Sequence, residues 1–496
     1  MNSSLPRTSV SFLLFLIVLV VYATTALRTV AATPLTYDEV YTVCLSQFSS
    51  PGQLWTWLES GTDLNPPLNY LITHLALQTF GTSPVGARIP SVAAYGGAVL
   101  FTFLFLRLRH RSELAGWLGG LALLACNLPF YAVVARAYAL MVFWGAAALL
   151  LWYLASHAKT AARRMWAAAG LGTALAAGIF SHYYCVLIVV PLGIAEATRL
   201  MTTGRIHKAT VLALAVGAAQ SLWLLPLVRT ARGFSSGFWR HPSWADIEIC
   251  YGNILLNFAL PVFLTAGVAF GVRRTGPAPE SEPEDRVADA AVLGYLLIPA
   301  AGVILAMVGT GAFDKRYVIL GYLGAAGVLA GLASLGLRRN SLGAGLVLLV
   351  LGGWALLGTE LRYRKKASEA GRFQETVTGI RGYAASGTVY VVDPELFLPV
   401  AFETPDVSGR LVYPADPALA KEFTGSDTDD RNLLQLAKAA PRLAVKPFTE
   451  CVPLMDGIVV GDGWQKVVWE KQGVKFKTLD PIGPKGPVYR IIALPR

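Results

Sequence analysis

Charged side chains are scarce in this sequence. Asp, Glu, Lys and Arg make up only 15% of the 496 residues, whereas 54% are hydrophobic and the mean hydropathy is +0.51. Soluble globular domains carry about 25% charged residues, so the composition excludes an ordinary soluble protein and indicates a chain that lies mostly in a bilayer. The net charge of +11 comes from short basic clusters between apolar runs, which argues against nucleic acid as a partner.

Familiar catalytic signatures are missing as well. The sequence contains no P-loop, no glycine fingerprint of dinucleotide-binding folds, no zinc-ligand spacing and no nucleophile elbow. These absences exclude ATP-driven transport and soluble hydrolase chemistry. The five cysteines have no metal-type spacing, and an odd number cannot pair completely. No internal repeat is found, which argues against transporters built from inverted repeats.

Apolar runs of the length that crosses a bilayer, about 20 residues, recur along the chain. They predict about eleven spans, the first an uncleaved helix rather than a signal peptide. The runs cover residues 11–30, 88–106, 113–130, 138–155, 165–181, 183–199, 208–228, 251–272, 289–309, 317–337 and 341–359. The shorter run Pro66–Phe80 has apolar residues on one helical face and polar residues on the other, so it predicts an interfacial helix.

The positions of the basic residues predict the orientation of the spans. With a cytoplasmic N-terminus, every inside connection is basic, as the positive-inside rule requires. These connections contain Arg107, Arg109 and Arg111; Lys159, Arg163 and Arg164; Arg199, Arg205 and Lys208; Arg273 and Arg274; and Arg338 and Arg339. The acidic stretch Glu280–Asp285, which has prolines around it, predicts a flexible inside loop.

Residues 360–496 have dense charges and only short apolar runs, which predict a soluble domain outside the membrane. Strands are expected at Thr388–Val392, Arg410–Tyr413 and Gly457–Val460, with further short strands in Val467–Ile492, and a helix at Leu433–Ala439. The predicted fold is a polytopic α-helical membrane protein, with a membrane domain over residues 1–359 and a soluble α/β domain over residues 360–496. The first outer loop, residues 31–87, would carry interfacial helices.

The outer segments hold the candidate catalytic carboxylates. Asp38 and Glu39 are adjacent and follow the first span. A carboxylate there could take a proton from an acceptor hydroxyl or hold a divalent cation. The alternative is an ordinary helix start in which Thr36 is the N-cap and Glu39 occupies the third helical position, since capping boxes are common.

Basic and aromatic residues are expected on the same side. Arg136 runs against the positive-inside trend, so it needs an anionic partner, either a carboxylate or a bound phosphate. Lys315 and Arg316 form either an anchoring ion-pair group with Asp314 or a clamp for an anionic donor. The remaining candidates, each with an interfacial role as the alternative, are Arg88, Tyr138, His182 and Tyr183.

Taken together, several short motifs resemble the GT-C superfamily of membrane glycosyltransferases, especially bacterial relatives of protein O-mannosyltransferases and of aminoarabinose transferases that modify lipid A. The resemblance covers roughly residues 1 to 340 and lies in the order and common sidedness of the motifs. These are Tyr37–Glu39, Asn65–Leu71 with Phe80–Gly81, Ala87–Ser91, Ala135–Tyr138, Ser181–Tyr184 and Phe313–Tyr317.

This resemblance implies an inverting hexosyl- or pentosyltransferase of the bacterial inner membrane, whose periplasmic side moves a sugar from a polyprenyl-phosphate carrier to a protein, lipid or glycan. Asp38 would be the catalytic base, supported by Glu39. Arg136, Lys315 and Arg316 would hold the lipid phosphate, with Arg88, Tyr138, His182 and Tyr183 completing the donor site. No metal ligand is predicted, and a divalent cation is left open as a cofactor.

Two qualifications come from the residues themselves. Aminoarabinose transferases have a Lys before Pro-Pro-Leu, where this chain has Asn65, so other residues must bind the donor phosphate. The alternative function is a transporter or flippase of lipid-linked saccharides, which would use the same helices and the same anionic-lipid clamp.

Overall fold

The computed structural model describes residues 7–238, 240–270, 283–336, 341–482 and 486–494. The chain divides into two compact units. The first, called the helical unit, comprises residues 1–28, 88–225 and 242–362. The second, called the outer unit, comprises residues 29–87, 226–241 and 363–496. Each is described by itself.

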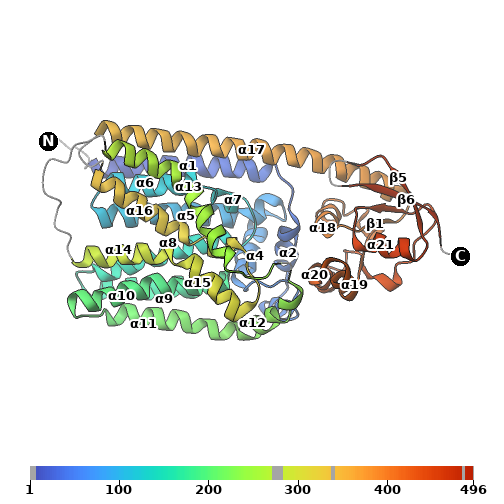
Figure 1. The fold of residues 1–496 in the computed structure, drawn as a ribbon, viewed down its shortest axis with the longest axis horizontal. Helices are drawn as coiled ribbons and strands as arrows, with labels where there is room; N and C mark the ends of the chain where they lie inside the picture. The colour runs from blue at the N-terminus through green and yellow to red at the C-terminus, as the bar shows by residue number, and fades with distance from the viewer. Residues whose placement is uncertain (1–6, 239, 271–282, 337–340, 483–485, 495–496) are drawn as a thin grey trace. The chain divides into compact units, whose positions relative to one another are not determined.

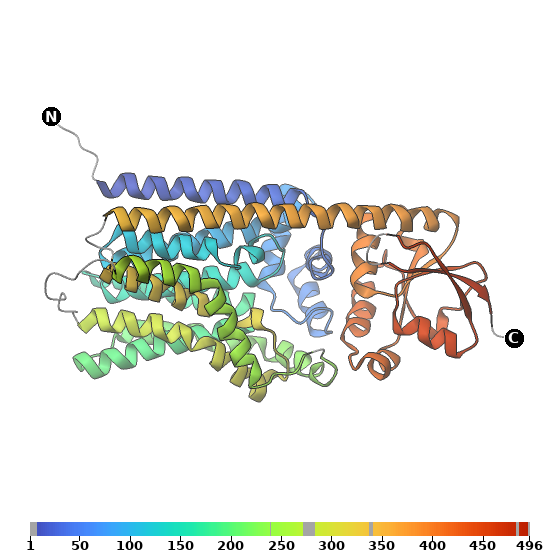
Figure 2. The same cartoon turned by 45° about the horizontal axis from the view of Figure 1, so that its top comes forward.

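The helical unit is built from the long apolar helices of the chain (Figure 1). Its elements are α1 (Arg7–Ala31), α5 (Pro84–His110), α6 (Glu113–Ala125), α7 (Pro129–Ala132), α8 (Tyr138–Ser156), α9 (Ala161–Ser181), η1 (Tyr183–Ile188), α10 (Val189–Thr203), α11 (Lys208–Ala219), η2 (Gln220–Leu224), α13 (Ala245–Phe270), α14 (Pro283–Leu296), α15 (Ile298–Leu305), η4 (Ala306–Thr310), η5 (Lys315–Val318), α16 (Gly321–Gly336) and the first part of α17 (Ser341–Ser386), up to Arg362. Helices α8, α9, α10, α11 and α14 pack side by side in both views (Figure 2).

The described residues of each of the eleven apolar runs are mostly helical. Among the described residues, 7 helices are long and apolar enough to cross a membrane, or up to 8 if the bent pair α14 and α15–η4 is one span. Shorter apolar helices lie at Glu113–Ala125 and Gly321–Ala333, and α9 is 21 residues long. The chain is therefore an integral membrane protein by the length and composition of its helices, while about eleven spans remains a prediction.

The acidic stretch expected to be a flexible inside loop is in part a helix start. Helix α14 begins at Pro283, and its first-turn carboxylates pair with arginines of other helices. Glu284 lies 3.2 Å from the buried Arg199, and Asp285 lies 2.9 Å from Arg109. The loop prediction for Glu284 and Asp285 is wrong because buried arginines need anionic partners; residues 280–282 lie outside the described residues.

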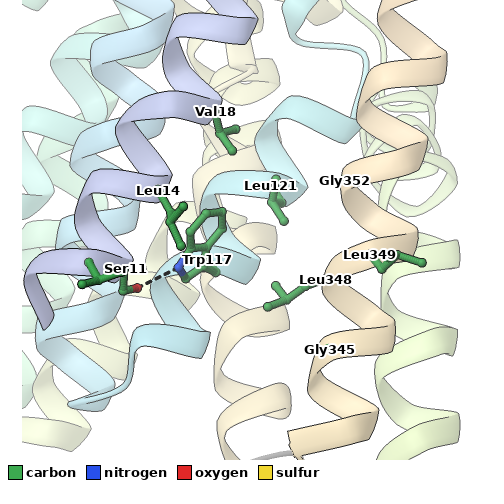
Figure 3. Close-up of a pocket in the computed structure, with 10 residues that line it drawn as sticks. Ser11, Leu14, Val18, Trp117, Leu121, Gly345, Leu348, Leu349 and Gly352 are labelled. Carbon is green, nitrogen blue, oxygen red and sulfur yellow. Dashed lines mark hydrogen bonds between the residues drawn. The ribbon is translucent and has the colours of Figure 1, made fainter. Parts of the chain in front are cut away.

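An apolar groove of about 760 Å³ lies between α1, α6 and α17 (Figure 3). At one side Trp117 Nε1 donates to Ser11 Oγ at 2.9 Å, and this hydroxyl donates to Glu113 Oε2 at 2.9 Å. The described residues that line the groove include none of the predicted site residues. The predicted site residues therefore lie in other parts of the fold.

The outer unit combines the first outer loop with a sheet domain. Its elements are α2 (Tyr37–Leu45), α3 (Pro51–Glu59), α4 (Leu68–Phe80), α12 (Leu225–Arg232), η3 (Ser235–Gly237), α17 from Tyr363 onward, β1 (Val389–Val391), α18 (Pro394–Glu403), η6 (Ser408–Arg410), β2 (Leu411–Ala415), α19 (Pro417–Thr424), α20 (Thr428–Ala439), β3 (Val445–Pro447), η7 (Phe448–Glu450), β4 (Ile458–Val460), α21 (Trp464–Lys471), β5 (Lys475–Leu479) and β6 (Val488–Ala493). The sheet order is β3-β2-β1-β4-β6-β5. Strands β3, β2, β1 and β4 run parallel to one another. Strand β6 runs antiparallel to both of its neighbours, β4 and β5.

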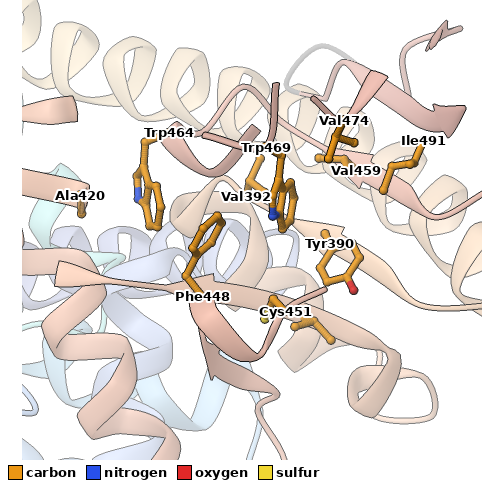
Figure 4. Packing of buried hydrophobic residues seen from close by; sticks show 11 residues of the cluster. Tyr390, Val392, Ala420, Phe448, Cys451, Val459, Trp464, Trp469, Val474 and Ile491 are labelled. Carbon is orange, nitrogen blue, oxygen red and sulfur yellow. The ribbon is translucent and has the colours of Figure 1, made fainter. Parts of the chain in front are cut away.

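The α/β character of this domain is confirmed, with one local error. The sequence predicted short strands from Val467 onward. Residues 464–471 instead form the helix α21. Gln465 and Trp469 are buried there one helical turn apart, and Trp464 and Trp469 pack on Phe448, with ring centroids 5.1 and 5.5 Å away (Figure 4). Contact with the core therefore favours a helix here, because these side chains reach the core with a 3.6-residue period. The neighbouring Val467 and Val468 do not reveal this period.

Stability of the sheet domain should depend on pH through Asp430. This buried carboxylate accepts from the Asp416 amide at 2.9 Å and the Tyr413 hydroxyl at 3.2 Å. Burial nevertheless raises the pKa of Asp430 to about 7. Because the folded state then binds a proton that the unfolded state has lost, stability falls as the pH rises from about 4 to about 7, by at most about 4 kcal/mol.

Hydrogen exchange of β1 and β2 in the purified full-length protein measures this effect. We expect faster exchange, corrected for the intrinsic pH dependence, at pH 8 than at pH 5. Asp430→Asn should remove most of the difference, and an unchanged difference in this variant would contradict the assignment.

Candidate functional site

A cluster of basic and aromatic side chains forms in the helical unit where three connections meet. Arg136 lies in the turn between α7 and α8, where its amide donates to the Val134 carbonyl at 2.8 Å. His182 ends α9 and caps η1. Arg316 is the second residue of η5, and Asp314 caps this turn by accepting at Oδ1 from the Arg316 amide at 2.9 Å. Segments far apart in sequence thus contribute to one place, which we call the Arg136–Arg316 cluster.

Aromatic rings surround the imidazole of this cluster. The His182 ring centroid lies 5.0 Å from that of Tyr317, 5.8 Å from Tyr184 and 5.9 Å from Tyr138. The Arg316 guanidinium lies 5.4 Å from the Tyr138 ring centroid, within cation–π range. These contacts fix the directions of the imidazole and of the guanidinium.

The electrostatics favour a neutral His182. Burial first, and then the charges of Arg136 and Arg316, lower the pKa of His182 to about 3. Its Nδ1 accepts from the Tyr184 amide at 3.3 Å, so the ring proton belongs on Nε2. At neutral pH the side chain can donate one hydrogen bond, but it carries no positive charge.

Asp314 forms an ion pair with Arg316. Its Oδ1 is 3.6 Å from Arg316 Nε, so the anchoring ion pair weighed from the sequence does form. Lys315 is exposed, and no ion pair of Lys315 occurs among the residues that the structure describes. Of the two neighbours predicted to clamp an anion, only Arg316 belongs to the cluster.

The other donor-site candidates lie near these elements. Arg88 is buried near the start of α5, and one turn later the Ser91 hydroxyl is 3.5 Å from the Arg136 carbonyl oxygen. Tyr183 is half-buried, whereas its neighbour Tyr184 contacts the His182 ring. Their roles in binding remain predictions.

The two candidate carboxylates belong to the outer unit and differ sharply. Glu39 is fully buried, and its Oε2 accepts from the Thr36 amide at 2.9 Å and hydroxyl at 2.8 Å. The capping box weighed from the sequence is therefore confirmed. Asp38 is half-exposed in the first turn of α2. A catalytic role for either remains a prediction.

Sequence reasoning missed the residues that hold α2. The Tyr37 hydroxyl donates to Asp429 Oδ1 at 2.9 Å and lies 3.1 Å from the Tyr41 hydroxyl. Tyr37 is part of the Tyr-Asp-Glu motif noted in the sequence. Its hydrogen-bond partner Asp429 could not be predicted, because it is 392 residues away. Within the described ranges, no group of three or more His, Cys, Asp or Glu side chains could hold a metal ion.

Comparison with known proteins gives the fold. No protein-family model matches the chain, and no curated protein matches it in sequence. The structure is similar to that of ArnT from Cupriavidus metallidurans in the apo state, with a TM-score of 0.62, 14% identity and 98% of each chain covered. For ArnT bound to undecaprenyl phosphate, the TM-score is 0.60 with 14% identity and 97% of each chain covered.

The structure is less similar to an oligosaccharyltransferase from Archaeoglobus fulgidus, with a TM-score of 0.46 and 13% identity. This match covers 94% of the present chain and 72% of the oligosaccharyltransferase. The likeness to ArnT shows an ArnT-like fold, mostly helical with a small C-terminal sheet domain, so the predicted fold class is confirmed.

Proposed function

We propose that this chain is a glycosyltransferase that moves a sugar from a polyprenyl-phosphate donor to an acceptor at the outer face of the membrane. The observation that carries the proposal is the Arg136–Arg316 cluster, two arginines beside a neutral imidazole in a chain with an ArnT-like fold. A structure of ArnT holds undecaprenyl phosphate, and this chain offers the groups that such a phosphate needs.

The chemistry of the leaving group explains the cluster. When the bond between the sugar carbon and the phosphate oxygen breaks, negative charge develops on polyprenyl phosphate. Fixed guanidinium groups stabilise that charge more than they stabilise the intact donor, which lowers the barrier. Arg136 and Arg316 supply the charge in our proposal, and His182 donates one neutral hydrogen bond from Nε2.

Acceptor activation is assigned to Asp38. The acceptor hydroxyl attacks the sugar carbon from the face opposite the phosphate, its proton passes to the Asp38 carboxylate, and polyprenyl phosphate leaves. A single displacement of this kind inverts the sugar carbon. Asp38 rather than Glu39 has this role because Glu39 Oε2 is occupied by the start of its own helix.

The neutral side chain of Asn65 is a reason to assign donor binding to arginines. Its Nδ2 donates to Asp63 Oδ1 at 3.0 Å, so a neutral amide bound to a carboxylate stands where the resemblance places a lysine. No positive charge comes from this position. The proposal therefore includes a phosphate held by the Arg136–Arg316 cluster and leaves the sugar unassigned.

The proposed setting is a bacterial inner membrane, with the N-terminus in the cytoplasm and residues 360–496 in the periplasm. The basic inside connections favour this orientation. The transporter alternative gains no support from the solved structures that resemble the chain.

Binding of polyprenyl phosphate to the purified protein tests the proposal. We expect affinity at least about 10-fold higher than for the matching polyprenol, because a charged hydrogen bond contributes about 1.5–3 kcal/mol. Arg136→Met should remove most of this preference. Arg381→Met, at an exposed ion pair with Asp406, is the control and should retain it. Equal binding of alcohol and phosphate by the wild-type protein would contradict the proposal.

A further inference from the structure

The first helix of the outer unit is held by the sheet domain at both ends. At the N-terminal end of α2, Tyr37 donates its hydroxyl hydrogen bond to Asp429. At the C-terminal end, the side chain of Arg442 hydrogen-bonds the buried Cys44. Between them, α2 packs against α18 and α20, and every residue from Glu39 to Leu45 is buried. The helix that carries Asp38 is thus fixed by residues from the far end of the chain.

The N-terminus of α20 also binds a second outer segment. Ser426 Oγ and Thr428 Oγ1 donate to the Gly237 carbonyl at 2.6 and 3.1 Å. Arg431 lies 3.9 Å from the Phe234 ring centroid and donates to the Gly233 carbonyl at 3.2 Å. Because these contacts secure α20, they also restrain Asp429, an exposed residue in its first turn.

Tyr37 and Asp38 are adjacent in the first turn of α2, so restraint of one restrains the other. The Tyr37 ring also packs on Tyr41, with centroids 5.2 Å apart. Asp429 accepts the hydroxyl hydrogen bond of Tyr37 even though Asp38, Glu395 and Asp393 are close enough to raise the pKa of the Asp429 carboxyl, after burial as the main cause. The hydrogen bond from Tyr37 acts against these causes and lowers the pKa of Asp429, so it stabilises the charged carboxylate.

We propose that Asp429 is a positioning residue, which holds Tyr37 so that Asp38 keeps the orientation needed to take the acceptor proton. This inference rests on the proposed glycosyltransferase function. It gives the sheet domain a role in turnover that is separate from donor binding, since the Arg136–Arg316 cluster belongs to the helical unit. Misplacement of a reacting group by about 1 Å can lower a rate by about 100-fold.

Steady-state kinetics of four variants test the inference. We expect Asp429→Ala and Tyr37→Phe each to lower kcat about 10- to 100-fold while the Kd for polyprenyl phosphate stays unchanged. Their double variant should be no slower than the slower single variant, because both remove one interaction. Asp429→Asn retains an acceptor oxygen and should recover most of the activity. The control Asp480→Ala changes an exposed carboxylate of the same domain and should match the wild type.

Hydrogen exchange of residues 38–41 gives a second readout that needs no turnover. Asp429→Ala should speed exchange there, whereas Asp480→Ala should not, and unchanged exchange would overturn the inference by itself. If the wild type transfers sugar and Asp429→Ala is as active as Asp480→Ala, the positioning role fails while the proposed function stands. If the wild type transfers no sugar, the proposed function fails instead.

Discussion

Replacement of Asp38 by Asn is expected to lower the kcat of sugar transfer by about 100- to 10,000-fold, the usual contribution of a general base. The amide has nearly the shape of the carboxylate but cannot take the acceptor proton. Because Asp38 is half-exposed at the start of α2, the variant should fold normally and bind polyprenyl phosphate as the wild type does. The measurement is single-turnover transfer from a labelled donor, with donor binding measured in parallel.

Glu39→Gln is the matched control for this variant. Glutamine retains an oxygen that can accept from the Thr36 amide and hydroxyl, so the capping box is kept. We expect a decrease of less than about 10-fold, since a capping interaction contributes only about 1 kcal/mol. If Glu39→Gln abolishes transfer and Asp38→Asn does not, the roles of the two carboxylates are reversed and the assignment to Asp38 is wrong.

Replacement of Arg316 by Ala is expected to lower kcat/KM for the donor by about 100- to 1,000-fold, as loss of one preorganised donor to developing charge does elsewhere. Arg316→Lys should recover only part of this loss, because an ammonium group keeps the charge without the planar fork that binds two oxygens. The measurement is release of polyprenyl phosphate at varied donor concentration.

Lys315→Ala is the neighbouring control. Lys315 is exposed, whereas the Arg316 guanidinium lies beside the Tyr138 ring and near Asp314. We expect less than a 3-fold effect from the lysine variant, because an exposed charge contributes little. Equal losses in both variants would mean that general positive charge, rather than the Arg136–Arg316 cluster, attracts the donor.

Local patterns in the sequence predicted most of the helical unit. A long apolar run has few alternatives in a bilayer, because only a helix satisfies its backbone within the segment. The end of α17 was harder to predict: charges from Glu360 onward suggested a new domain, but the helix continues to Ser386, since a helix outside the bilayer needs no apolar run. The capping box at Thr36 and Glu39 could be predicted as an alternative, and it is present, because all of its atoms lie within four residues.

Contacts between distant segments could not be predicted in the same way. The pairing of Tyr37 with Asp429 joins two outer segments that share no pattern. The sidedness of Arg136, His182 and Arg316 was inferred from the basic inside connections, but their proximity depends on how α8, α9 and η5 pack. The neutral state of His182 also depends on that packing, because it follows from burial and from the two arginine charges.

One measurement tests the central claim most directly. The purified protein is placed in lipid vesicles with labelled polyprenyl-phosphate sugars and an acceptor extract, and the label and the free polyprenyl phosphate are both followed over time. We predict that polyprenyl phosphate is released in a 1:1 ratio with label transferred to the acceptor, and that Asp38→Asn and Arg316→Ala suppress both products. Movement of the intact donor across the bilayer, with no release of polyprenyl phosphate for any sugar, would contradict a glycosyltransferase.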